Sequence, residues 1–426
     1  MSSEQHPVLS RRATLAGLAA SCAAGLATPM RRAWAEDAGP IFSPTGPNAE
    51  RYGAAAGYPV PGVVKAQWQG NPWQPGDRVG AFTHIDDIYP TRQVKHAAAP
   101  WTFKRAPAEL SEPFRAEVTG YLARNPVTGL LIAKDDQILF EHYQYGRTDR
   151  DRFVSQSMVK SITGLLMGIA ISEGAIKSVD DTPETYVPGF RGSEYGRTPI
   201  RDLLHMSSGV DFGEEAEGGR DLSRLWKDMV AGSWISGKGT VNSIIQFNRR
   251  IAPPGTRFHY ASIEPDVLGM VLRAATGKSL SDYLQEKIWQ PIGAEADARW
   301  MLDAEGFELA HFGFNAVLRD YARLARLLAH DGAWGGRQII PAQWMVDATT
   351  VRPSDGYLAP GKADRDFGYG YLLWLLPWGQ RQFAMFGDFG QRVCIDPASK
   401  IVMVHAGLEQ TPELWKLWLA SLKRFS

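Results

Sequence analysis

The stretch SMVKSITGLLMGIAISE, residues 157–173, repeats apolar side chains at every third or fourth position, which is the pattern of a helix with a buried face. Ser157 and Lys160 stand at its beginning, three residues apart, so their side chains share one face. A serine hydroxyl becomes a good nucleophile only when a neighbouring base removes its proton. Lysine can be that base where burial or a nearby cation lowers its pKa. The simpler alternative is a surface serine that caps a helix carrying a lysine.

Strand-like segments stand on both sides of this helical region. Residues 128–133 and 138–143 are joined by a polar turn at 134–137, which predicts a β-hairpin. Further strands are predicted at 370–375, 382–386, 391–395 and 401–405, and further helices at 201–206, 265–276, 281–289, 316–330 and 413–423. This order predicts one α+β domain, residues 113–426, whose terminal segments share an antiparallel sheet. Residues 36–112 are rich in Pro, Gly and Trp, which predicts an irregular segment wrapping that domain.

A second candidate group lies in PGTRFHYAS, residues 254–262, where a Pro-Gly turn leads into an extended stretch. Tyr260 and Ser262 are two residues apart, so on extended backbone their hydroxyls point the same way. A lysine ammonium beside a tyrosine favours the phenolate, which then exchanges protons with a nucleophile and a leaving group. The alternative is a buried tyrosine with a satisfied hydroxyl.

A third candidate group is FGDFGQRV, residues 386–393, where two glycines precede a predicted strand and allow a substrate to approach the backbone. The backbone N–H of Gln391, next to Gly390, and that of Ser157 would then donate to a developing oxyanion. The alternative is a glycine-rich turn that only leads into a strand.

Other polar residues have simpler explanations. A Ser-His-Asp triad would need a Gly-x-Ser-x-Gly nucleophile turn, and the sequence has none. We therefore interpret the three candidate histidines as structural: His205, His259 and His405. The paired acids Glu214-Glu215 stand in a polar loop and are expected to be solvated. Cys394 lies in an apolar run typical of a core, and no Cys/His spacing indicates a metal site.

Composition narrows the function classes. The chain has 426 residues, 44% of them hydrophobic, with 46 basic and 46 acidic side chains and zero formal net charge. There is no basic stripe that would indicate nucleic acid as a partner. No apolar run reaches the length of a membrane span. A small-molecule substrate therefore fits better than a nucleic acid. The oligomeric state stays open.

The first 35 residues have the features of an export signal. Arg11-Arg12 precede an alanine-rich apolar run, and Ala33-Trp34-Ala35 places small residues at a signal-peptidase site. Twin arginines predict export of the folded chain to the periplasm or the exterior. Whether cleavage follows Ala35, or a lipid is attached at Cys22, is left open by the sequence.

The order Ser-x-x-Lys, Tyr-x-Ser and a glycine-flanked C-terminal strand resembles the serine β-lactamase and penicillin-binding-protein superfamily, especially its class C-like esterases and aminohexanoate-oligomer (nylon-oligomer) hydrolases. LLHMSSG, residues 203–209, and FGYGY, residues 367–371, extend the resemblance, which covers about residues 120–420. It implies a β-lactamase-like α+β fold, an antiparallel sheet flanked by helices with a mostly helical subdomain.

The resemblance also implies roles for individual residues. Ser157 would be the acylated nucleophile, Lys160 its proton partner, and Tyr260 the group that protonates the leaving group and later activates water. Ser262 matches a position usually held by Asn, and the Gln391 N–H matches the second oxyanion donor. The resemblance implies no metal or organic cofactor.

One departure concerns the substrate. Asp388-Phe389-Gly390 stands where the family usually has Lys-Thr-Gly or His-x-Gly, and an aspartate there would repel a substrate carboxylate. We therefore expect hydrolysis of an ester or linear amide with a neutral or cationic end, and poor hydrolysis of β-lactams. Asp388 either recognises an amine or faces solvent. The alternatives are a D,D-peptidase or β-lactamase, and a relative that keeps the fold without turnover.

Overall fold

The computed structural model describes residues 39–58, 73–214, 220–231, 238–379 and 381–426. The predicted signal at residues 1–35, with its cleavage site after Ala35 and the alternative lipid site at Cys22, lies outside the described residues. Part of the predicted wrapping segment, residues 59–72, lies outside them as well. The remaining chain belongs to the unit Glu36–Ser426.

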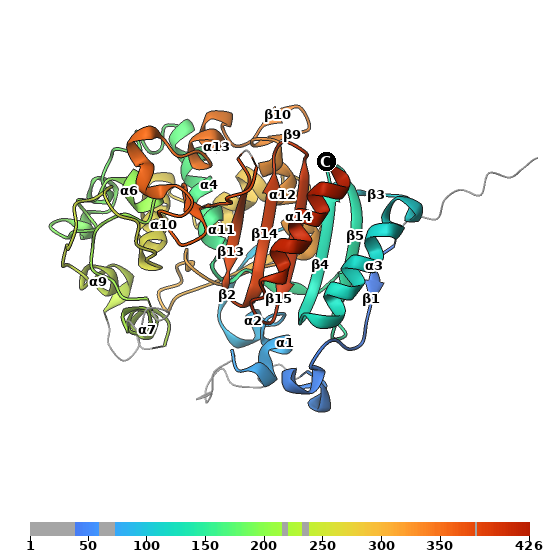
Figure 1. Cartoon of the computed structure of the whole chain (residues 1–426). Coiled ribbons are helices and arrows are strands. Elements are labelled where there is room, and N and C mark those ends of the chain that lie inside the picture. Colours follow the sequence, from blue (N-terminus) through green and yellow to red (C-terminus); the bar gives the residue numbers. More distant parts are fainter. Residues whose placement is uncertain (1–38, 59–72, 215–219, 232–237, 380) are drawn as a thin grey trace, which may run out of the picture. The chain divides into compact units, whose positions relative to one another are not determined.

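A large sheet with the strand order β1-β5-β4-β15-β14-β13-β12-β11 forms the centre of this unit (Figure 1). The early strand β4 pairs antiparallel with the late strand β15, as the sequence predicts. The predicted hairpin is also confirmed, since β4 and β5 pair antiparallel across Asp135 and Asp136. The strands are β1 Ile41–Phe42, β4 Val127–Lys134, β5 Gln137–Tyr143, β11 Gly368–Tyr369, β12 Trp374–Leu375, β13 Phe383–Gly387, β14 Gln391–Asp396 and β15 Ile401–Gly407.

Two details of the sheet differ from the prediction. The short strands β1 and β3 (Lys104–Arg105) pair parallel with β5, so this edge of the sheet is not antiparallel. The strand predicted at 370–375 is instead two short strands, because the chain reverses between β11 and β12, which pair antiparallel. Leu372, in that reversal, has φ of 55°, a conformation that side-chain pattern does not reveal.

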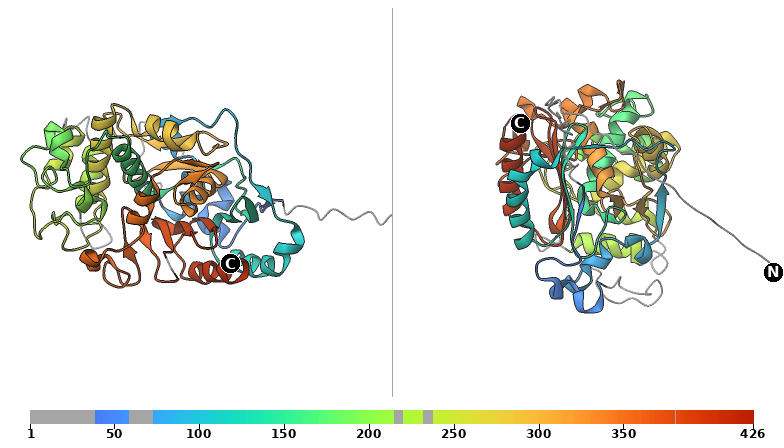
Figure 2. Two further views of the ribbon diagram at one scale, coloured as in Figure 1. Left: turned by 90° about the horizontal axis from the view of Figure 1, so that it is seen from above. Right: turned by 90° about the vertical axis from the view of Figure 1, so that its right-hand side faces the viewer.

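Helices cover both faces of the sheet (Figure 2). On one face, α3 (Ala108–Arg124) and α14 (Glu413–Phe425) bury a smaller core that contains the fully buried Trp418. On the other face, α4 (Val159–Ser172), α10 (Ile263–Thr276) and α12 (Leu318–Ala329) pack into the main core. The helix predicted at 316–330 begins later because residues 314–317 form strand β8.

The rest of the unit supplies the predicted mostly helical subdomain and a small second sheet. That sheet has the order β2-β7-β8-β6. Its strand β6 pairs with β8 and ends at the residue before Ser155. Its strands are β2 Thr91–Val94, β6 Arg152–Val154, β7 Ala298–Met301 and β8 Phe314–Val317. The shorter helices are α1 Arg78–Ala81, α2 Ile85–Ile88, α5 Pro183–Tyr186, α6 Ile200–Leu204, α7 Asp221–Trp226, α9 Gly239–Ile245, α11 Leu280–Leu284 and α13 Ala342–Ala348. Within the residues described, no helix combines the length and apolar character needed to span a membrane.

Candidate active site

Ser157 lies in a tight turn between β6 and α4. A 3-10 turn, Gln156–Met158, precedes the helix, and Gln156 has φ of 48°, which is rare for a residue with a side chain. Ser155 holds this turn, because its N–H donates to the Phe314 carbonyl (2.7 Å) and its Oγ accepts from the Phe314 N–H (3.1 Å). These hydrogen bonds stabilise the strained backbone conformation at Gln156. In proteins, strained conformations of this kind are most common at functional sites.

Lys160 is buried and points at the serine. Its Nζ donates to Ser157 Oγ (2.7 Å) and to the carbonyl oxygen of His311 (2.9 Å), and only 2% of the residue is exposed. Asp266, in α10, fixes that carbonyl, because its carboxylate accepts from the Ala310 N–H (2.9 Å) and pairs with His311 Nδ1 (2.8 Å). Two acceptors in a dry site therefore fix the position of the amine.

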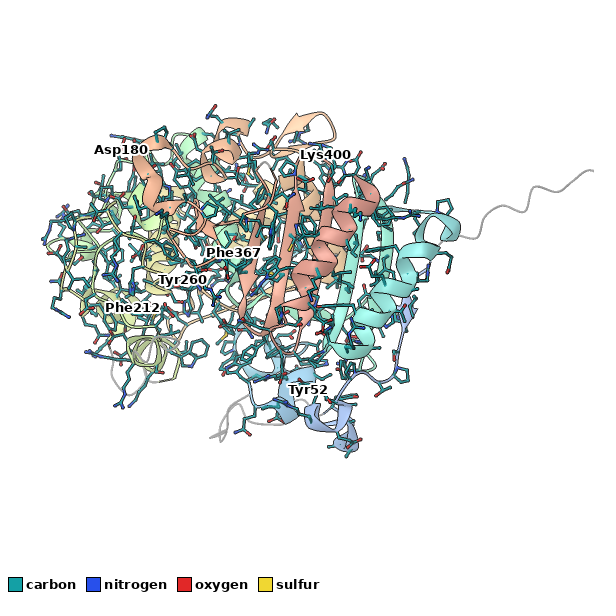
Figure 3. All side chains as sticks on the ribbon, viewed as in Figure 1. Tyr52, Asp180, Phe212, Tyr260, Phe367 and Lys400 are labelled. Carbon is teal, nitrogen blue, oxygen red and sulfur yellow. The ribbon has the colours of Figure 1, made fainter. Side chains whose placement is uncertain are left out.

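Tyr260 completes the group. The Lys160 Nζ lies 5.1 Å from the centre of the Tyr260 ring. Burial raises the pKa of Tyr260 above its usual value, while the charge of Lys160 and hydrogen bonds with Ser157 and Lys160 act to lower it. Figure 3 shows Tyr260 beside the sheet, on the side of the helical subdomain. A hydroxyl, an amine and a phenol from two separate parts of the chain thus share one hydrogen-bonded cluster.

Ser262 and Glu214 support this cluster. The sequence pattern predicts extended backbone at Ser262. The structure differs, because Ser262 has helical dihedral angles at the N-cap of α10. Its N–H donates to Oε1 of Glu214, a residue predicted to be solvated that is 92% buried. Burial raises the pKa of Glu214, and the Lys160 charge opposes that shift. The partner is far away in the sequence, so local polarity gave no sign that Glu214 enters the site.

The third candidate group is organised differently from the prediction. Gly387, at the end of β13, packs so closely on the nucleophile turn that a Cβ atom there would lie 2.3 Å from the Ser155 carbonyl oxygen. Residues Asp388–Gly390 then form a 3-10 turn, and the Gln391 N–H donates to the Asp388 carbonyl. The Gln391 side chain donates to the Gly407 carbonyl (2.6 Å). The Gln391 N–H is therefore engaged within the turn, and its role as the second oxyanion donor stays a prediction.

The turn offers another donor. Asp388 is its first residue, and the first N–H groups of a helical turn have no partner within it. Because Asp388 follows Gly387 directly, its N–H is the better candidate beside the nucleophile turn. The Asp388 side chain itself is exposed. Gly390 has φ of 85° and presents its carbonyl to His405 Nδ1 (2.7 Å), so it shapes the turn.

His405 has the structural role that the sequence predicts. It is buried among β15 and α3, where burial lowers its pKa to about 4 and keeps the ring neutral. A carbonyl only accepts, so Nδ1 carries the proton given to Gly390, and Nε2 accepts from the Tyr121 hydroxyl (2.8 Å). His259 Nε2 pairs with the Phe212 carbonyl (2.7 Å). In the described part of the chain, no cluster of three or more His, Cys, Asp or Glu side chains suits a metal ion.

Arg392 is the cation within the third group, and Arg78 lies beside it, with its guanidinium 4.3 Å from the centre of the Phe389 ring. The Arg392 guanidinium lies 4.3 Å from the centre of the Phe386 ring and donates to the carbonyls of Gly387 and Gln391. Burial lowers the pKa of Arg392 to about 10, while the nearby Asp388 and Tyr260 act to raise it. The guanidinium is thus committed to the backbone of the turn.

Comparison with known proteins identifies the family of the chain. A family model described as Beta-lactamase matches residues 114–406. The chain belongs to the β-lactamase family. This β-lactamase-family hydrolase is 25% identical over 377 residues to a 6-aminohexanoate-dimer hydrolase of Paenarthrobacter ureafaciens, covering 84% of this chain and 91% of that protein.

Solved structures share the fold. One is a Bacillus anthracis protein proposed to be a 6-aminohexanoate-dimer hydrolase, with 22% identity and a TM-score of 0.69 over 83% of this chain and 94% of that chain. Another is a family VIII carboxylesterase, with 17% identity and a TM-score of 0.57 over 76% of this chain and 99% of that chain. The predicted β-lactamase-like α+β fold is thereby confirmed.

Proposed function

We propose that this protein hydrolyses an ester or a linear amide through an acyl-serine intermediate on Ser157. The observation that carries the proposal is the 2.7 Å hydrogen bond between the buried Lys160 Nζ and the Oγ of the partly exposed Ser157, in a cluster that also holds the Tyr260 hydroxyl. The similarity to an aminohexanoate-dimer hydrolase supports an amide substrate, and the carboxylesterase fold is consistent with an ester.

In the first step, Ser157 Oγ bonds to the substrate carbonyl carbon while its proton passes to the pair formed by Lys160 and Tyr260. The carbonyl oxygen becomes negative, and the N–H groups of Ser157 and Asp388 stabilise it. The bond to the leaving group then breaks, and Tyr260 returns a proton to the departing oxygen or nitrogen. Water, deprotonated by the same pair, releases the acid and restores Ser157.

A fluorophosphonate probe tests the nucleophile directly, because it forms an Oγ–phosphorus bond and releases fluoride only at an activated serine. We expect stoichiometric labelling at Ser157, located by peptide mass spectrometry, and no labelling of Ser157→Ala. Ser172→Ala, a change on the same helix away from the site, is the matched control and should label normally. Labelling of another serine, or none, would refute the proposal and favour a relative without turnover.

The charges at the third group predict weak activity on β-lactams. A β-lactam carboxylate needs a cationic partner, but the two guanidinium groups beside this turn, those of Arg78 and Arg392, both donate to backbone carbonyls. Losing one charge-assisted hydrogen bond costs about 10- to 100-fold in kcat/KM. We expect nitrocefin to be hydrolysed at least that much more slowly than p-nitrophenyl acetate. Equal rates would instead favour the β-lactamase or D,D-peptidase alternative.

A further inference from the structure

Five aromatic side chains cluster on the α14 side of the sheet, and each keeps part of its surface exposed. Their rings contact one another: Phe367 lies 5.0 Å from Phe386 and 5.2 Å from Trp415, and Trp378 lies 5.3 Å from Trp415. Trp374 joins the cluster through Phe386, at 5.0 Å and an angle of 14° between ring planes. We call these residues the aromatic trough; Phe367 is labelled in Figure 3.

The surface is hollowed at the trough. A cavity of about 390 Å³ is bounded by three of these rings and by neighbouring loop residues: Phe367, Trp378, Trp415, Pro360, Gly361, Arg365, Asp366 and Pro377. A second cavity of about 230 Å³ is also bounded by Trp415, together with Gly390 and Arg392. The first volume falls within the range of ligand pockets in proteins.

The trough is continuous with the candidate active site. The Tyr260 ring stacks on Trp374, with 5.7 Å between centroids and 27° between planes, and Trp374 stacks in turn on Phe386. Phe386 directly precedes Gly387, the residue packed against the nucleophile turn. Gly390 and Arg392, which border the second cavity, belong to the same turn and strand start as Asp388. A substrate bound at Ser157 therefore has a wall of rings leading toward the cavities.

The chemistry of the trough favours an uncharged group. Contiguous exposed aromatic surface is unfavourable in water and commonly marks a binding site. At the rim, Arg365 and Asp366 pair at 4.0 Å and balance each other. Arg392 is committed to backbone carbonyls and to the Phe386 ring. No unpaired charge in this set calls for an ionic ligand, and the rings offer flat apolar contacts.

We propose that the aromatic trough is a substrate subsite that binds an apolar alkyl or aryl group of the ester or amide cleaved at Ser157. The inference rests on the proposed function and adds a substrate class to it. Only substrates long enough to pass Trp374 and Phe386 can reach Trp378 and Trp415. The contribution of those two rings therefore depends on chain length.

The test measures kcat/KM for p-nitrophenyl esters from acetate to octanoate in wild type, Trp378→Ala and Trp415→Ala. In wild type, kcat/KM should rise with chain length, because each buried methylene adds to binding. In the two variants the octanoate value should fall about 10-fold or more, and the acetate value should change less than about 2-fold. Leu419→Ala, an exposed position on the same helix α14, is the matched control and should behave as wild type.

Fluorophosphonate labelling of Ser157 in each variant separates the two proposals. Normal labelling with an unchanged chain-length dependence in Trp378→Ala and Trp415→Ala would overturn the trough and leave the proposed function intact. Absence of labelling in wild type would instead overturn the proposed function. Melting temperatures show whether each variant folds; if Trp415→Ala does not, Trp378→Ala, in a surface turn, decides alone.

Discussion

Replacing Lys160 with methionine should lower kcat/KM for a p-nitrophenyl ester by about 10³- to 10⁴-fold, the upper range for loss of a positioned proton-transfer group. Methionine keeps a long apolar side chain in this buried position but removes the amine that contacts Ser157 Oγ. The serine proton then has no nearby base except Tyr260. Fluorophosphonate labelling should slow by a similar factor, since the probe requires the same activation.

The variant also removes the donor to the His311 carbonyl, which is buried. Leaving such an acceptor unpaired costs about 1–3 kcal/mol, so thermal unfolding must be measured alongside activity. Lys400→Met is the matched control, because Lys400 Nζ likewise donates to a backbone carbonyl, that of Ala329 (2.9 Å), away from the site. It should lose stability without losing activity. A Lys160→Met enzyme that keeps a tenth of wild-type activity would show that lysine is not the proton partner.

The sequence predicted those parts of the site whose geometry follows from local periodicity. Ser157 and Lys160 meet because residues three apart on a helix share a face, and β4, β5, β14 and β15 follow their apolar runs. The sequence did not predict the 3-10 turn at Asp388–Gly390, because that turn depends on backbone conformations that cannot be inferred from residue types. Phe389 has φ of 59° inside the 3-10 turn, and this turn engages the Gln391 N–H.

Contacts between distant segments were missed for a related reason. The polar neighbours of Glu214 in the sequence predict a solvated side chain. In the structure Glu214 is buried, accepts a hydrogen bond from the Ser262 N–H, and interacts with the charge of Lys160. Asp266 likewise gave no signal, since its partners, Ala310 and His311, come from another part of the chain. Buried polar groups of this kind need partners, and only the tertiary structure supplies them.

Tyr260→Phe should separate two roles of the phenol, because it removes only the hydroxyl and keeps the ring that stacks on Trp374. Burial raises the pKa of Tyr260, so its hydroxyl is protonated at neutral pH and can supply a proton to the leaving group. An amine leaving group must receive a proton, whereas p-nitrophenolate departs without one. We therefore expect a loss of about 10³-fold on a linear anilide but only about 10-fold on a p-nitrophenyl ester.

The difference between the losses on the anilide and on the ester shows which proton transfer uses the Tyr260 hydroxyl. Tyr369→Phe, a change at a fully buried tyrosine whose ring lies 6.3 Å from that of Tyr260, is the control and should affect neither substrate more than about 2-fold. Equal losses on both substrates would assign Tyr260 to activation of Ser157 rather than to the leaving group. Full activity on the anilide would exclude the phenol from proton transfer, and Lys160 would then have to carry the proton in both directions.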